Sequence, residues 1–130
     1  MVLGIWNLTV MHHKRRGRIF GRKRDQRKAF LKSLVSALVI RGRIQTTEAR
    51  AKEIRPLVEK LITKAKSATK GKASLALRRQ IIDVTSPRVA KILIDKIAPK
   101  YEDRVGGYTR ILKMGVRKSD AARLALIEFV

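Results

Sequence analysis

The chain has 130 residues, enough for one domain with a small core, and 45% of them are hydrophobic. Lysine and arginine number 32 against 10 acidic residues, and the resulting net charge of +22 raises encounter rates with polyanions. Because the chain has no cysteine, disulfides, zinc–thiolate sites and cysteine nucleophiles are excluded, and its longest apolar run, near residues 34–40, is too short to span a membrane.

A dense basic segment occupies residues 11–24 and continues into the first expected helix. Hydrophobic residues are almost absent from it, so burial cannot offset its ordering entropy, and its like charges repel one another. We interpret it as an arm that binds an anionic partner, most commonly nucleic acid. The alternatives are a solvated tail or a targeting peptide, but transit peptides are rich in serine and this segment has none. The cations of the arm and of the helix that follows are Lys14, Arg15, Arg16, Arg18, Arg22, Lys23, Arg24, Arg27 and Lys28.

Signals of catalysis and of metal binding are weak. His12 and His13 are adjacent and lie beside arginines, whereas metal ligands are usually spaced and accompanied by acids. The acidic residues are scattered, and no nucleophile, base or phosphate loop accompanies them. We therefore expect no enzyme activity, no metal, no cofactor and no small-molecule substrate.

The first expected helix begins after the basic segment. Asp25 is a plausible cap, and Gly42 would end the helix because glycine tolerates a left-handed conformation. Residues 43–46 (RIQT) then predict a short strand. The apolar stripe of the helix has spacings of three and four and comprises Phe30, Leu31, Leu34, Val35 and Leu38.

The second expected helix is capped by Thr46 or Thr47 and carries Glu48 in its first turn, at the positive end of the dipole. Pro56 should kink this helix or restart it near Arg55, because proline lacks the amide donor. Residues 67–72 (SATKGK) predict a linker turn.

Two further helices and two strands complete the pattern. Residues 73–82 predict a third helix, and Ser86 followed by Pro87 predicts the start of a fourth, which Pro99 stops. Residues 108–114 and 123–130 are rich in strand formers, and residues 115–122 would join them as a hairpin. This order predicts an α+β domain in which helices pack on one small sheet.

The segment RVGGYTRILK, residues 104–113, allows two interpretations. Gly106 and Gly107 could form a simple turn, or they could let the backbone approach a phosphate closely between flanking cations. Tyr108 could stack on a base or cap the core. The sequence does not choose between them.

Several segments together resemble the bacterial large-subunit ribosomal protein L-seventeen family. These are MHHKRRGRIFGR at the start of the arm, TTEARAKE at residues 46–53, PLVEKLITKAK at residues 56–66, RVGGYTRILK, and the final ALIEFV. The resemblance covers residues 11–130 in order. Residues 1–10 precede it as an extension, which is either a wrongly assigned start or a lineage-specific addition, and Pro56 lies earlier in its helix than is usual for the family.

The resemblance implies a two-layer α+β fold of order α-β-α-α-α-β-β, with a small mixed sheet covered by helices. Residues 25–130 would form the single globular domain, and residues 11–24 would be the RNA-binding arm. The role implied is structural and non-catalytic: binding large-subunit ribosomal RNA beside neighbouring ribosomal proteins near the rim of the peptide exit tunnel, in the cytoplasm or in an organelle. The RNA-binding residues expected besides the nine basic residues at positions 14–28 are Arg43, Arg104, Gly106, Gly107, Tyr108, Thr109, Arg110 and Lys113.

A nucleoid-type DNA-binding protein is the alternative that explains the same charge. A reader of the major groove needs a recognition helix, and a helix-turn-helix needs two helices joined by a tight turn. Here a strand is expected between the first two helices, so the sequence favours the ribosomal interpretation.

Overall fold

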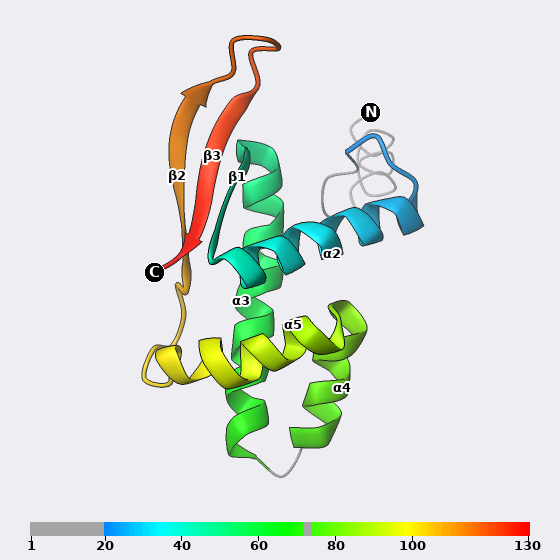
Figure 1. The fold of residues 1–130 in the computed structure, drawn as a ribbon, viewed down its shortest axis with the longest axis vertical. Coiled ribbons are helices and arrows are strands. Elements are labelled where there is room, and N and C mark those ends of the chain that lie inside the picture. The colour runs from blue at the N-terminus through cyan, green and yellow to red at the C-terminus, as the bar shows by residue number, and fades with distance from the viewer. Residues whose placement is uncertain (1–19, 72–73) are drawn as a thin grey trace, which may run out of the picture.

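The computed structural model describes residues 20–71 and 74–130, and those ranges contain four α-helices and three strands. Figure 1 shows the long helix α3 beside the sheet, with α2 and α5 crossing it. None of the described helices has the length and apolar character needed to span a membrane. In chain order the elements are α2 (Arg24–Arg41), β1 (Arg43–Thr47), α3 (Glu48–Lys70), α4 (Ser74–Val84), α5 (Pro87–Ile92), β2 (Thr109–Val116) and β3 (Arg123–Phe129).

The sheet is antiparallel throughout, in the order β1-β3-β2, so the expectation of a mixed sheet is wrong. The strands β2 and β3 form a hairpin, which makes them antiparallel neighbours. Strand β3 lies between β1 and β2, so these two strands, which run the same way, never pair with each other. A β-bulge between Lys113 and Gly115 interrupts the pairing of β2 near the end of the hairpin.

Helix α3 runs unbroken through Pro56, so the expected restart near Arg55 is wrong. Proline in a helix interior costs about 3 kcal/mol. Seven residues of α3 are buried, and each large apolar side chain among them stabilises the fold by about 1.5–3 kcal/mol, so packing outweighs the proline. Ala65 and Ala68 are among the seven, which explains why the helix continues to Lys70 where the sequence suggested a linker from residue 67.

For helix α2, the predicted end at Gly42 is confirmed, but the predicted cap at its start is not. Gly42 ends the helix with φ +81°, and its amide donates to the Leu38 carbonyl at 2.8 Å. At the other end the cap position is Lys23, which makes no side-chain cap, and Asp25 lies inside the first turn. The carboxylate of Asp25 is therefore near the positive end of the dipole and does not cap the helix as expected.

The chain after α5 is held by two irregular turns. Ser86 caps α5 by accepting the amide of Val89 at 3.4 Å, as the Ser-Pro pair predicted. The α-helical geometry ends at Ile92 and continues as a π turn, Leu93–Ile97, followed by a 3-10 turn, Ala98–Tyr101. Pro99 therefore does not stop the helical path; it lies within the 3-10 turn, where its missing amide is tolerated.

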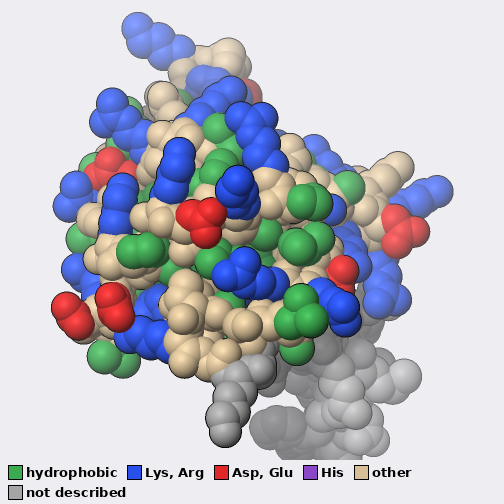
Figure 2. Space-filling view, turned by 60° about the horizontal axis from the view of Figure 1, so that its bottom comes forward, with side chains coloured by type: hydrophobic (Ala, Val, Ile, Leu, Met, Phe, Trp, Pro, Cys, Tyr) green, Lys and Arg blue, Asp and Glu red, His purple; other side chains and the backbone are tan. Residues whose placement is uncertain are grey.

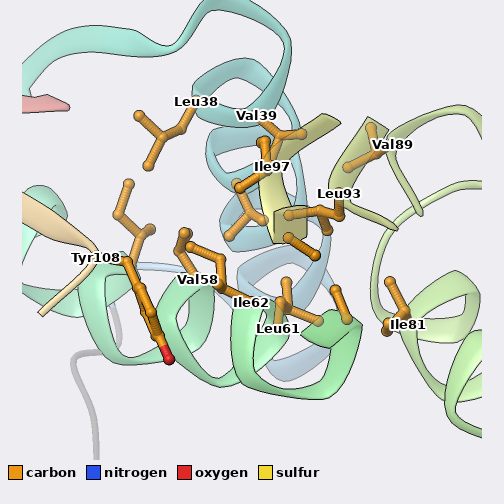
Figure 3. Packing of buried hydrophobic residues seen from close by; sticks show 14 of the residues in the cluster. Leu38, Val39, Val58, Leu61, Ile62, Ile81, Val89, Leu93, Ile97 and Tyr108 are labelled. Carbon is orange, nitrogen blue, oxygen red and sulfur yellow. The ribbon is translucent and has the colours of Figure 1, made fainter. Parts of the chain in front are cut away.

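One hydrophobic core joins the helices to the inner face of the sheet. Figure 3 shows Tyr108 lying along α3 at one end of this core and Ile81 of α4 at the other. Strands β1 and β3 contribute three buried residues to this core, Ile44, Ala125 and Ile127. The opposite face of the sheet has no helix packed on it in the described part of the chain.

Candidate nucleic-acid interface

Residues 20–22, near the end of the predicted arm, are attached to the domain by aromatic and cation–π contacts. The guanidinium carbon of Arg22 lies 3.8 Å from the centre of the Phe30 ring, and that of Arg50 from α3 lies 4.9 Å from it. The ring of Phe20 meets Phe30 edge-on at 5.8 Å, and Arg22 Nη1 donates to the Phe20 carbonyl at 2.9 Å. Arg22 therefore helps to hold the last residues of the predicted arm against the domain.

The segment of residues 104–113 is attached to α3 by hydrogen bonds to two α3 side chains, Lys66 and Glu59. Lys66 Nζ donates to the Tyr108 hydroxyl at 3.0 Å and also to the Arg104 carbonyl, while the Tyr108 hydroxyl donates to that carbonyl at 3.2 Å. One residue later, Thr109 Oγ1 donates to Glu59 Oε1 at 3.1 Å. Tyr108 and Thr109 are therefore part of the buried interior, and the two residues are only 1% and 2% exposed.

The two tyrosines near this segment are shifted in opposite directions. The hydrogen bond from Lys66 lowers the pKa of Tyr108 below its ordinary value, because the ammonium favours the phenolate. Burial raises the pKa of Tyr101, whose hydroxyl donates to the Val130 carbonyl at 2.8 Å. The centres of the two rings lie 5.3 Å apart. The pair therefore connects the segment to the C-terminus through Tyr101 and to α3 through Tyr108.

Residues 104–107 form an exposed loop over α3. Gly107 has φ +64°, a left-handed conformation that favours glycine, whereas Gly106 has no such requirement. Val105 is 97% exposed, and hollows of about 500 and about 470 Å³ lie beside it against α3. The Arg104 side chain folds back, with Nε donating to the Gly106 carbonyl at 3.1 Å. The loop therefore presents backbone and one apolar side chain between two hollows.

Cations from α3 line the walls of these hollows. Lys60 and Lys64 lie one turn apart beside one hollow, and neither has a carboxylate partner in the described part of the chain. Lys70 lines the other hollow and pairs with Glu102 at 3.3 Å. Figure 2 shows lysine and arginine side chains spread over the whole visible face, between small hydrophobic patches, with few acidic side chains among them. Such a surface suits an extended polyanion.

Comparison with known proteins identifies the family. The sequence model of the family described as Ribosomal protein L17 matches residues 30–130, which is most of the chain. The chain belongs to this family. A relative from Shouchella clausii, described as Large ribosomal subunit protein bL17, is 50% identical over 115 residues, covering 85% of this chain and 95% of the relative.

Two more relatives with the same description extend the match. One from a Thermoanaerobacter species is 51% identical over 114 residues, covering 87% of this chain and 97% of its own length. Another, from Clostridium acetobutylicum, is 48% identical over 114 residues, covering 87% and 96%. Members of the Ribosomal protein L17 family are structural proteins, so this chain is a ribosomal protein and not an enzyme.

The residues that the sequence predicted as RNA-binding fall into distinct groups. Lys14, Arg15, Arg16 and Arg18 lie outside the described residues, as do His12 and His13. Lys23, Arg24, Lys28 and Arg43 are exposed, and Arg27 is half-buried. Arg110 Nε is bound to Glu128 at 2.6 Å, and Lys113 is 3.9 Å from Glu48. Of the two alternatives for Tyr108, the structure favours the core cap, because a side chain this deeply buried has no open face for a base.

Sequence reasoning missed the lysines of α3. Lys60 and Lys64 have the spacing of one helical turn, and Lys66 joins that helix to the loop. Their position four residues apart on the polar side of a long amphipathic helix was a signal that could have found the first two. The contact of Lys66 with Tyr108 spans 42 residues, so no local pattern could indicate it.

Proposed function

We propose that this protein is a structural constituent of the large ribosomal subunit that binds and stabilises ribosomal RNA through its basic arm and a basic face of its domain. That face comprises the loop of residues 104–107 and the adjoining side of α3. The protein would lie near the rim of the exit tunnel, beside other large-subunit proteins, in a cytoplasmic or organellar ribosome.

The observation that carries this proposal is the dense set of cations at residues 14–28 in a chain of this family. Of the described residues in that stretch, Lys23, Arg24 and Lys28 are exposed where α2 begins. Lysine and arginine side chains release condensed counterions when they contact phosphates. Exposed cations that ion pairs do not neutralise are therefore available for RNA.

The shape of the domain is consistent with RNA in preference to duplex DNA. RNA is recognised through its shape, its 2′-hydroxyls and its unstacked bases, which suit loops and shallow hollows. A helix-turn-helix requires two helices joined by a tight turn, and strand β1 separates α2 from α3. Family membership also supports the ribosomal role over the nucleoid-type alternative.

A salt titration tests the arm. A transcript of large-subunit ribosomal RNA is the probe, and its affinity is measured over a series of salt concentrations. The test variant lacks residues 1–18, which removes four cations but keeps Phe20 and Arg22 on Phe30. The matched control removes four exposed cations from α4 and α5 by substitution with glutamine, at Arg78, Arg79, Arg88 and Lys91.

Each phosphate contact contributes about 0.7 to 0.9 to the slope of log affinity against log salt, so losing two to four contacts should reduce the slope by about 1.4 to 3.6. We expect this loss for the arm variant and a clearly smaller loss for the control. Equal slopes for the full chain and the folded arm variant would show that the arm is not the RNA anchor.

A further inference from the structure

The outer face of the sheet carries an apolar patch with no covering element in the described part of the chain. Ala125 and Ile127 of β3 are buried on the inner face, so Leu124 and Leu126 between and beside them point outward. Leu126 pairs in register with Leu112 of β2, which is 44% exposed. Met114, at the bulge, is 52% exposed. We call Leu112, Met114, Leu124 and Leu126 the outer sheet patch.

The strand that borders this patch has a free edge. Because β3 lies between β1 and β2, strand β2 pairs on one side only within the described residues. On its other side alternate amides and carbonyls face outward over the regular part, Thr109 to Lys113, until the bulge ends the ladder. Figure 1 shows that the β2–β3 hairpin extends beyond β1, and that the helices lie on the β1 side of the sheet, away from β2. An extended segment could add to this edge by strand pairing.

The chemistry of the patch selects protein over nucleic acid. Three leucines and a methionine offer no donors to phosphate, and Arg110, on the same face of the sheet, is already bound to Glu128. A second copy of this chain is disfavoured by a net charge of +22 and by the cations at both ends of the patch.

Those flanking cations define the charge of the partner. Arg43 lies beside the patch at one end, and Lys118 lies in the turn at the end of the hairpin. Neither of these two residues forms an ion pair with a carboxylate among residues 20–71 and 74–130. A partner with apolar side chains at its centre and acidic side chains on either side would complement them.

We propose that the free edge of β2 and the outer sheet patch bind an extended, acid-flanked segment of another large-subunit protein by strand addition. This proposal rests on the function proposed above, because it needs the chain to be part of a large subunit. In this arrangement the arm and the α3 side of the domain bind RNA, and the outer face of the sheet binds protein.

Photo-crosslinking in purified large subunits tests it. The photoreactive residue p-benzoylphenylalanine replaces Leu112 in one variant and the exposed Val105 in another, and the adducts are identified by mass spectrometry. We expect Leu112 to capture a ribosomal protein through an acid-rich extended segment, and Val105 to capture ribosomal RNA. In a third variant the crosslinker replaces Met114, with and without Leu112→Glu. Adding a charge where a leucine would be buried should reduce the protein adduct about tenfold.

The outcomes separate the two proposals. RNA, a second copy or no adduct at Leu112, together with RNA at Val105, would overturn strand addition and leave the RNA-binding role intact. An unchanged adduct at Met114 in the Leu112→Glu variant would also overturn it, provided that the melting temperature of the free protein is unaltered. Failure of both variants to enter large subunits, while the unsubstituted chain also fails, would overturn the proposed function itself.

Discussion

Replacement of Gly107 by alanine is expected to destabilise the protein, whereas the same replacement at the neighbouring Gly106 is not. An added Cβ meets little at either position: the nearest atom to it at Gly107 is an Arg104 side-chain nitrogen at 3.9 Å, and at Gly106 nothing lies within 4 Å. The two glycines therefore differ in backbone conformation and not in available space. Gly107 has φ +64°, a left-handed conformation that costs an L-residue about 1–2 kcal/mol, and Gly106 does not have a positive φ.

This free-energy difference sets the size of the effect. With an unfolding entropy of about 2.1 cal/mol/K per residue, a loss of about 1–2 kcal/mol in a chain of this length lowers the melting temperature by about 4–7 °C. Gly106→Ala should leave the melting temperature unchanged or raise it slightly, because alanine reduces the entropy of the unfolded chain. Thermal unfolding by circular dichroism measures both variants. Equal melting temperatures would refute the conformational argument.

The same pair of variants also tests the approach of RNA to the loop. If the backbone at Gly106 contacts a phosphate directly, an added methyl group should weaken binding to large-subunit RNA while the fold stays intact. Unchanged affinity of Gly106→Ala would show that this glycine serves only the turn.

Three further predictions concern the Tyr108 hydroxyl, the Glu48 ion pair and residues 1–10. Tyr108→Phe removes the hydroxyl that binds Lys66, and it should lower the free energy of unfolding by about 2 kcal/mol in a denaturant titration without changing the salt slope of RNA binding. The hydrogen bond from Lys52 lowers the pKa of Glu48 below its ordinary value of 4.5, so this ion pair stabilises the fold above that pH and is lost as pH falls through the lowered pKa. Glu48→Gln should accordingly flatten the loss of melting temperature between neutral pH and pH values below 4.5, and an unaltered acid limb would contradict this. A variant that begins at Met11 should enter large subunits as well as the full chain does, and markedly poorer incorporation, measured by quantitative mass spectrometry, would show that residues 1–10 contribute.

Local sequence signals determined most of the secondary structure. Thr47 caps α3 by accepting the amide of Arg50, Ser86 caps α5, and Gly42 ends α2. The apolar stripe of α2 also predicted buried side chains, of which Val35 and Leu38 are in the core. These signals act within one or two helical turns, so neighbouring residues alone are enough to express them.

The basic character of the surface was equally evident from the sequence, because an excess of 22 positive charges cannot be buried in a core of this size. What composition could not indicate was which cations remain free. Arg22 stacks on Phe30, Arg110 is bound to Glu128, and Lys66 holds Tyr108. Each of these contacts depends on where other elements lie, and two of them join residues far apart in the chain.

Only the tertiary structure decided the remaining features. Pro56 stays within a continuous helix because packing along the whole of α3 outweighs a local cost that sequence rules treat as a break. The sheet is antiparallel because β3 returns between two strands that the chain places far apart. Tyr108 is a core residue because Lys66, Arg104 and Tyr101 close around it, although its sequence context suited a surface contact equally well. Helix caps and periodicities are fixed by neighbours in the chain, whereas burial, strand order and charge neutralisation depend on which surfaces meet after folding.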